Sequence, residues 1–532
     1  MRGFVAVLCA VLAVTVVGAA QGAPRVTGVA VTDFDHGLQF PRNKQNEPSI
    51  ARDPQTGALI AGANDEFSLN LCRGALAPLT SPCPFTPGAP ISAYYRSTDN
   101  GKSWSGGYLP GFASIGRSSG GDPSLDVGPK RCDDGRTFSW SCGSVVYYAS
   151  LADSFPEFGG EQVTVSRSYD DGANWVAPVE ATSTDNKSDF DDHEWIAVDR
   201  GAGSPNFGRV YLFWADYCNT CAGNGRVKLF VGSSADEGRT WTKAVRVSGS
   251  AFNAVQGQIE TGQIAVASDG TVEAFWTDHA DSTGKYPSTQ VVAVSRDGGA
   301  TFTGPAAVAG VTDYPLSGTP FDIVDLYNRV PGMSARVDCY PHPAADPTSN
   351  RVYVVWCDFS GGVGTVRGAF SDDGTNWTTL GTVGAVFMRN AFFPAADVSP
   401  KGLLVVGFGA LTAPPAGDLW QTGQQVYDYY EVQGGAAGFT TPLRVSQASS
   451  NPEASSYNNL KEQFLGDYTD LAAGPNSSYL AWTDASAASL CGAVSDYRAA
   501  VYAGLSVFAP NPDSACPTGF GNTDTAIGIV AN

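Results

Sequence analysis

Three of the four histidines stand near acidic residues at positions that we expect on one rim of the fold: His193, His279 and His342. A histidine held among carboxylates can act as a general base. With a tyrosine it could abstract the C5 proton of a uronic acid and protonate the leaving oxygen, which is the chemistry of a polysaccharide lyase. The alternative is a surface histidine that only hydrogen-bonds its acidic neighbour. We take His193 and His342 forward as candidate catalytic residues.

Four carboxylates crowd into the six residues around His193: Asp189, Asp191, Asp192 and Glu194. Carboxylate oxygens are the ligands that Ca²⁺ prefers. The run lacks the spacing and the glycine of an EF-hand loop, so a solvated acidic loop is the alternative. The sequence therefore predicts a candidate calcium site here and no other cofactor.

A tyrosine follows an acid in the late stretch Gly466-Asp467-Tyr468. Glycoside hydrolysis needs a protonated carboxylic acid together with a second carboxylate, or with a tyrosine that a neighbouring carboxylate makes nucleophilic. Tyr468 is thus a candidate nucleophile. A tyrosine that simply packs in the core is the alternative.

A short motif recurs five times and indicates the elements that must position these side chains. Residues 97–104, 168–175, 234–241, 295–302 and 370–377 read Ser-x-Asp-x-Gly-x-x-aromatic, and the last copy, with its Asp at 372, lacks the leading Ser. Ser and Asp side chains can bond the backbone of a tight turn, Gly supplies a positive φ, and the ring packs between strands. Each copy therefore predicts a hairpin turn, which by itself says nothing of catalysis.

A second pattern precedes these turns: a strand with a polar opening, a turn, and a strand that ends in an aromatic residue and Asp. It occurs seven times, once as a weak copy at 393–409. Four-stranded sheets of this size bury both faces only when they pack in a closed ring. We predict an all-β protein, a β-propeller of seven four-stranded blades with six as the alternative, forming a single domain over 23–532. The alternating stretch 25–32 should complete the last blade.

The alternating strand directions bring the openings of the first strands and the ends of the second strands to one rim. The acidic residues at these positions are Glu47, Asp65, Asp122, Asp153, Asp192, Glu194, Asp216, Glu260, Asp278, Asp338, Asp358, Asp467 and Asp484. The repeated turns should lie on the opposite face. For any one closing Asp, the alternative is a side chain that caps its own turn.

The five turns resemble the Asp boxes of the sialidase-like repeat family of β-propellers. That resemblance implies a secreted exo-glycosidase with an early Arg, an Asp acid/base, a mid-chain Glu, two further Arg that help bind the substrate carboxylate, and a late Tyr nucleophile. In this sequence those roles fall on Arg42, Asp65, Glu260, Arg336, Arg389 and Tyr468. Two features depart from the family: Asn46-Glu47-Pro48 stands where its Arg-Ile-Pro opening belongs, and the family's sialidases have six blades.

The charge balance restricts the ligand. The 52 acidic residues outnumber the 32 Lys and Arg, for a formal net charge of −20. Such a protein repels nucleic acid and anionic membrane surfaces. The charge therefore favours a neutral or cationic ligand, or bound calcium. The family resemblance implies a sialidase-like exo-glycoside hydrolase that acts on a carbohydrate at the channel face. The alternatives are a non-catalytic glycan-binding or scaffold propeller, and a polysaccharide lyase.

The N-terminus predicts export. Met1 and Arg2 precede the apolar run 4–17, which is short for a membrane-spanning helix, and then small residues, so residues 1–22 read as a secretory signal peptide. Ten cysteines follow it, and an even number in a secreted protein predicts disulfides. The nearest-neighbour pairs are 72 with 83, 132 with 142, 218 with 221, 339 with 357, and 491 with 516.

Overall fold

The structure is a computed structural model. It describes residues 26–32, 37–72, 82–154, 160–183, 189–218, 227–249, 259–279, 287–315, 328–337, 340–412 and 425–531, with only the backbone of Asp189 and of 259–261. The signal-peptide prediction therefore lies outside the described residues. In the described part, no helix is both long and apolar enough to cross a membrane.

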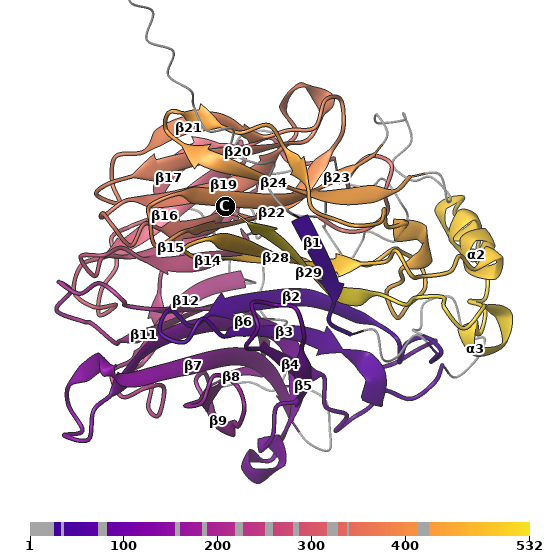
Figure 1. The fold of residues 1–532 in the computed structure, drawn as a ribbon. Helices are drawn as coiled ribbons and strands as arrows, with labels where there is room; N and C mark the ends of the chain where they lie inside the picture. Colours follow the sequence, from indigo (N-terminus) through magenta and orange to yellow (C-terminus); the bar gives the residue numbers. More distant parts are fainter. Residues whose placement is uncertain are drawn as a thin grey trace, which may run out of the picture.

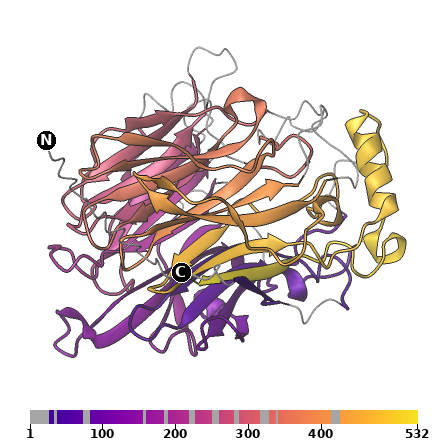
Figure 2. The same ribbon diagram turned by 45° about the horizontal axis from the view of Figure 1, so that its top comes forward.

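Seven antiparallel sheets follow one another along the chain and form the blades of a propeller, as predicted (Figures 1 and 2). Blade one contains β2 (Gln45–Arg52), β3 (Leu59–Asp65), β4 (Ser92–Ser97) and β5 (Ser105–Tyr108). Blade two contains β6 (Arg117–Arg131), β7 (Phe138–Ser154), β8 (Gln162–Ser168) and β9 (Val176–Glu180). Blade three contains β10 (Asp189–Val198), β11 (Val210–Cys218), β12 (Val227–Ser234) and β13 (Val245–Arg246). Blade four contains β14 (Ile259–Val266), β15 (Val272–Asp278), β16 (Thr289–Ser295) and β17 (Ala306–Gly310).

The remaining blades keep this order. Blade five contains β18 (His342–Ala345), β19 (Val352–Asp358), β20 (Thr365–Ser371) and β21 (Thr378–Gly384). Blade six contains β22 (Ala391–Val398), β23 (Leu404–Leu411), β24 (Tyr427–Gly435), β25 (Gly438–Phe439) and β26 (Leu443–Arg444). Blade seven contains β27 (Asp470–Ala473), β28 (Ser477–Asp484) and β29 (Asp524–Ala531). Because each blade alternates strand directions, the first strand starts on the face where the second ends.

The ring closes through its first strand. In Figure 1 the indigo strand β1 (Val26–Ala30) lies beside the yellow strands of blade seven. It pairs antiparallel with β29, with Val26 opposite Val530 and Ala30 opposite Ala526. The predicted addition of the N-terminal strand to the last blade is thereby confirmed. Full closure removes the exposed strand edges that an open ring would leave.

Apolar side chains of the middle strands fill the space between neighbouring blades. One core cluster joins blades four to seven around Trp356, Val405 and Trp482, and another joins blades three and four around Phe213 and Trp276. The strands read as near-continuous apolar runs because both faces of each sheet are covered.

The repeated turns lie between the third and fourth strands, on the face away from the strand-one openings. In the first, the backbone N–H of Gly101 donates to Ser97 Oγ at 2.9 Å, and Trp104 Nε1 donates to the Gly101 carbonyl at 3.0 Å. The fifth turn corrects the sequence alignment, because it does contain a leading serine. Ser371 Oγ donates to Asp373 at 3.1 Å, so Asp373 rather than Asp372 holds this turn.

A helical insertion connects β28 to β29. It contains α2 (Gly492–Tyr502) and α3 (Pro512–Ala515), seen in yellow at the side of the ring in Figure 1. The Cys491–Cys516 disulfide ties it together. The predicted pairs Cys72–Cys83 and Cys132–Cys142 are also confirmed. Each of the other two predicted pairs has one member outside the described residues.

Candidate functional site

A cavity of about 740 Å³ opens on the face where the first strands begin. Its lining includes the acidic residues Glu47, Glu66, Asp122, Asp153, Glu161, Asp192 and Asp467, the basic residues Lys44, His193 and Arg336, and the aromatic residues Phe85, Tyr457 and Phe464. Five of these carboxylates belong to the rim that the sequence predicted: Glu47, Asp122, Asp153, Asp192 and Asp467. The long connections between second and third strands, and between blades, emerge on this same face and build the cavity wall.

A repeated β-bulge places three of the lining residues. The first strands of blades one, two and three each shift register by a bulge near their start. Within the bulges Glu47, Asp122 and His193 have positive φ values of 54°, 52° and 51°. Bulges re-aim side chains, and positive φ in non-glycine residues stores strain that often marks a functional site. The cavity thus receives one polar side chain from each of three successive blades.

Three carboxylates form a hydrogen-bonded chain in the cavity. Asp122 is hydrogen-bonded to both Glu47 and Asp192. Asn64 holds the chain in place, since its Nδ2 donates to Glu47 Oε2 at 2.6 Å and its Oδ1 accepts the Asp122 backbone N–H at 2.6 Å. Two carboxylates can hydrogen-bond each other only if they share a proton, so part of this chain is protonated.

Burial sets the pKa values of the chain. Burial, followed by the neighbouring Asp192 charge, raises the pKa of Asp122 to about 6. Burial likewise raises the pKa of Asp192 to about 6. For Glu47, burial and the charge of Asp122 raise the pKa well above its usual range. The cavity therefore contains carboxylic acids that can donate a proton at mildly acidic pH.

The fourth carboxylate of the cavity centre is an ion-paired anion. Arg336 Nε and Nη2 donate to Asp467 Oδ1 and Oδ2, both at 2.6 Å. The guanidinium also lies over the Phe464 ring, 5.0 Å from its centroid. His193 Nε2 is 3.6 Å from Asp467 Oδ2. An ionised carboxylate fixed in this way is suited to act as a nucleophile or general base.

The second cation of the cavity is also neutralised. Lys44 Nζ is 2.6 Å from Glu66 Oε1 and donates to Asn458 Oδ1 at 2.7 Å. The rings of Phe40, Tyr457 and Phe464 surround it at 5.4 to 5.8 Å from their centroids. Its side chain is 1% exposed. The lysine is thus a buried structural cation that supports the wall.

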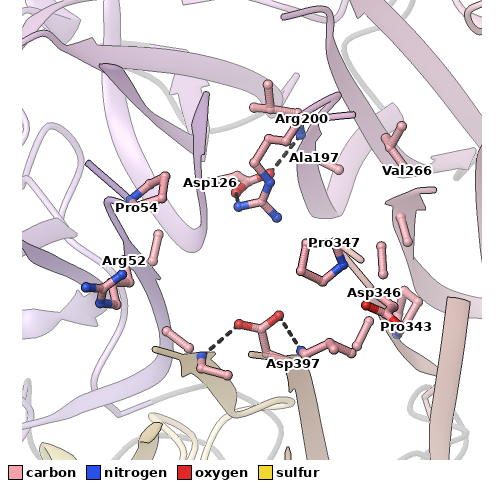
Figure 3. Close-up of a pocket in the computed structure, with 18 of the residues that line it drawn as sticks. Arg52, Pro54, Asp126, Ala197, Arg200, Val266, Pro343, Asp346, Pro347 and Asp397 are labelled. Atoms are coloured by element: carbon pink, nitrogen blue, oxygen red, sulfur yellow. Dashed lines mark hydrogen bonds and ion pairs between the residues drawn. The ribbon is translucent and has the colours of Figure 1, made fainter. Parts of the chain in front are cut away.

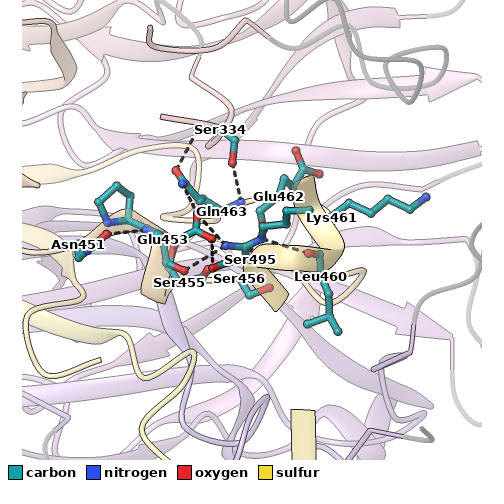
Figure 4. A network of polar contacts seen from close by, with 12 residues as sticks. Ser334, Asn451, Glu453, Ser455, Ser456, Leu460, Lys461, Glu462, Gln463 and Ser495 are labelled. Carbon is teal, nitrogen blue, oxygen red and sulfur yellow. Dashed lines mark hydrogen bonds and ion pairs between the residues drawn. The ribbon is translucent and has the colours of Figure 1, made fainter. Parts of the chain in front are cut away.

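The insertion holds one wall of the cavity through Arg498 of α2. This arginine is 1% exposed and donates to the carbonyls of Glu453, Ser455, Leu460 and Glu462 at 2.8 to 3.1 Å. Figure 4 shows the surrounding network, in which Ser334 and Gln463 bond each other. The segment organised in this way, residues 451–464, supplies Tyr457, Asn458 and Phe464 to the cavity.

The residues implied by the family resemblance do not come together. Arg336 lines the cavity, but Arg42 donates to the Phe67 carbonyl at 2.9 Å and Arg389 bonds Tyr430, and neither lines it. Asp65 caps the following turn, accepting the Phe67 N–H at 3.0 Å. The side chain of Glu260 lies outside the described residues.

Tyr468 is a buried tyrosine behind the cavity. Its hydroxyl donates to the Pro123 carbonyl at 3.3 Å, and its ring packs edge-on against Trp195. Burial, reinforced by the charges of Asp122 and Glu47, raises its pKa well above the usual range. Such a hydroxyl stays protonated, so the predicted nucleophile has the environment of a packed tyrosine.

Several of the predicted rim acids cap their own turns, which is the alternative given for them from the sequence. Asp358 accepts the Ser360 N–H at 2.9 Å, and Asp484 accepts the Ser486 N–H at 2.6 Å. Asp216 lies 3.8 Å from Lys228. The predicted Asp338 is outside the described residues.

The predicted calcium ligands separate. Asp192 lines the cavity, whereas Asp191 accepts a hydrogen bond from Thr182 and its pKa is raised to about 7 by burial. Glu194 is buried, which raises its pKa well above the usual range. The Asp189 side chain lies outside the described part. Within that part, no three His, Cys, Asp or Glu side chains are grouped so as to hold a metal ion.

His342 belongs to a second cavity of about 430 Å³, at the other mouth of the channel (Figure 3). Its Nδ1 accepts the Ala396 backbone N–H of blade six at 3.2 Å. In the same way, Asp397 of blade six accepts the Ala473 N–H of blade seven at 2.7 Å. Asp126 of blade two accepts the Val198 N–H of blade three at 2.8 Å. These side chains satisfy the free edge of the neighbouring inner strand, so His342 is a connector between blades. His279, 3.1 Å from Asp313, lines neither cavity.

Sequence reasoning missed Glu161, Asn46 and Asn64. Glu161 immediately precedes β8, a third strand, and third strands also start at the cavity face. Including those positions in the rim would have found Glu161. Lys44, Phe85, Tyr457 and Phe464 lie in connections that carry no repeat signal.

Comparisons with known proteins give similarity to solved propellers only. No protein-family model matches the chain. No curated protein matches it either. The Hadza microbial sialidase Hz136 is 14% identical over 72% of this chain and 65% of that one, with a TM-score of 0.42. An α-L-arabinanase of Penicillium chrysogenum, complexed with arabinobiose, is 12% identical over 96% and 98% of the two chains (TM-score 0.39), and an ulvan lyase is 11% identical over 64% and 78% (TM-score 0.37). At values this low, the chemistry must be argued from the chain's own residues.

Proposed function

We propose that the protein is a glycoside hydrolase that acts on a glycan in the carboxylate-lined cavity. The observation that carries this proposal is the hydrogen-bonded chain of Glu47, Asp122 and Asp192 beside the ion-paired Asp467. Hydrolysis of a glycosidic bond requires a protonated acid on one side and an ionised carboxylate on the other. The cavity offers an acid with a raised pKa, Asp122, and a carboxylate paired with an arginine, Asp467.

Asp122 is the proposed general acid, because its pKa of about 6 keeps it protonated at mildly acidic pH while still allowing proton transfer. Asp467 is the proposed nucleophile or base, held in orientation by the Arg336 fork. The ring of Phe85, which is 39% exposed, offers an apolar face on which a sugar ring can pack.

The same geometry favours carboxylate chemistry over the sialidase-type chemistry that the sequence predicts. A sialic acid or a uronic acid brings a carboxylate of its own, and the cavity's two permanent cations already have partners in Glu66 and Asp467. A lyase acting on uronic-acid polymers meets the same obstacle, although His193 is in place. We also propose that the protein is secreted, on the basis of residues 1–22, with the three disulfides as support.

The test is hydrolysis of aryl glycosides by the wild type and by Asp122→Asn. Loss of a general acid spares substrates with a good leaving group and abolishes turnover of those with a poor one. We expect Asp122→Asn to retain most activity on dinitrophenyl glycosides and to lose about 100-fold or more on methylumbelliferyl glycosides. Asp372→Asn, on the opposite face, is the matched control.

Tyr468→Phe separates the two mechanisms. If Asp467 is the nucleophile, this variant keeps activity within a few fold, whereas Asp467→Asn loses it and azide restores part of it. Sialoside turnover that depends on Tyr468 would replace the proposal with the sialidase-like one. Glycan binding without turnover of any substrate would leave a binding propeller.

A further inference from the structure

Among the described residues that line the cavity, carboxylates outnumber the permanent cations. Its lining holds seven carboxylates and two permanent cations. Each cation is committed to one carboxylate at 2.6 Å, Lys44 to Glu66 and Arg336 to Asp467. Among the described lining residues, no other permanent cation faces the carboxylate chain or Glu161, whose pKa is raised well above its usual range by burial and by Asp153.

A buried side-chain amide in the same cavity has an N–H group without an acceptor in the part of the chain that the structure describes. Asn46 is 1% exposed and lines the cavity, and its Oδ1 accepts from Asn64 at 3.0 Å. Its Nδ2 has no acceptor among the described residues. A buried donor without an acceptor costs free energy, which a ligand oxygen would recover. The cavity therefore fits a ligand with hydroxyl oxygens as well as positive charge.

We infer that the glycan substrate carries a protonated amine, and that its class is the amino sugars without an N-acetyl group. This inference rests on the proposed function of the cavity. An ammonium group has three donors for surrounding carboxylates, while the ring hydroxyls supply acceptors for Asn46 and a ring face can pack on the exposed Phe85. An ammonium ion also favours the charged form of each nearby carboxylate, so its binding should release a proton from a carboxylate other than Asp122, which keeps its proton for catalysis.

Neutral and anionic glycans fit the charges less well. A neutral sugar leaves the carboxylates repelling one another. An anionic sugar adds to that repulsion, because neither Lys44 nor Arg336 is free to pair with it. The amine is the one common glycan charge that the lining complements.

The experiment compares substrates that differ only at C2. Both anomers of 4-nitrophenyl 2-amino-2-deoxyglucoside, its N-acetyl form and the plain glucoside would be assayed at low and high salt. We expect kcat/KM to be about tenfold or more higher for the amine, with the advantage shrinking as salt increases. Glu161→Gln should reduce this preference several-fold, whereas Asp372→Asn should leave it unchanged.

The outcomes distinguish failure of the amine inference from failure of the proposed function. Equal kcat/KM for the three substrates overturns the amine inference and leaves the proposed hydrolase intact. If no glycoside is hydrolysed, the proposed function fails, and calorimetry with glucosamine oligomers and their N-acetylated counterparts then tests the inference alone. Tighter binding of the amine supports it if the measured binding enthalpy also changes with the ionisation enthalpy of the buffer, which shows that protons are released. Equal binding, or binding without proton release, overturns it.

Discussion

Arg336 and Asp467 are 131 residues apart in sequence and form a two-pronged ion pair across the cavity, with both N···O distances at 2.6 Å. Arg336 comes from the connection between blades four and five, and Asp467 from the start of blade seven. The pair therefore bridges two segments that the ring topology alone does not fix against each other.

Breaking this ion pair should lower the activity while the protein stays folded. Arg336→Gln leaves the Asp467 carboxylate without its fork, and we expect kcat to fall about 100-fold as its orientation is lost. Arg336→Lys keeps the charge but not the planar geometry and should recover only part of the loss. Steady-state kinetics and circular dichroism measure both effects. Equal activity of the wild type and Arg336→Gln would contradict a role for Asp467.

The raised pKa of Asp122 predicts an acidic pH profile. Activity that needs protonated Asp122 should decline as the pH rises through about 6. Asp122→Asn should lose that limb when assayed with a good leaving group. A profile that stays flat from pH 5 to about 8 would argue against this acid.

Stability should follow pH in the same direction. The pKa of Asp192 is raised from 3.8 to about 6, so between these values the folded protein binds more protons than the unfolded chain. The free energy of unfolding then decreases as the pH rises from about 4 to about 6 and levels off above. Asp192→Asn should abolish up to about 3 kcal/mol of this dependence. Urea unfolding at several pH values tests it, with Asp372→Asn as the control.

His342 should matter for stability and not for catalysis. Because its Nδ1 accepts the Ala396 N–H, its proton sits on Nε2, 3.4 Å from Asp470 Oδ1. His342→Phe leaves that N–H unpaired and should cost about 1–3 kcal/mol, whereas His342→Asn offers an oxygen in its place and should cost less. Below the unfolding transition both variants should keep their kcat. A large loss of kcat in both would instead support the lyase interpretation of this residue.

Arg498 should be the most sensitive residue of the insertion. Arg498→Met orphans four carbonyls and the partner Glu453, 3.2 Å away, all in a buried network. We expect a loss of about 3–5 kcal/mol, with higher KM because the 451–464 wall shifts. Arg351→Met removes an arginine paired with the exposed Asp372 and should cost at most about 1 kcal/mol. Similar losses in both variants would contradict a special role for the network.

The ring could be predicted from the sequence because its signals are local. The turn at 97–104 encodes itself within eight residues, and the same spacing recurs in each copy. The strand directions then place Glu47, Asp122, Asp192 and Asp467 on one rim. The fifth turn was located as well, although it was predicted without a leading serine and with its Asp at 372, whereas Ser371 and Asp373 hold it.

The rest depends on contacts between distant segments. No local pattern indicates that Arg336 meets Asp467, or that Arg498 organises residues 451–464. The bulges at Glu47, Asp122 and His193 also escaped prediction, because register shifts are set by the neighbouring strand. Tyr468 looked available beside Asp467, but Asp467 lines the cavity whereas the Tyr468 ring packs against Trp195.

The pairing of β1 with β29 has a consequence for how the molecule is made. Residues 26–30 are synthesised long before their partners at 526–530. The first six blades can form while β1 is still unpaired. Until β29 is synthesised, the ring stays open and leaves unpaired strand edges. The ring thus cannot close before β29 has been synthesised, and a chain that stops before β29 would leave strand edges open to pairing with other chains.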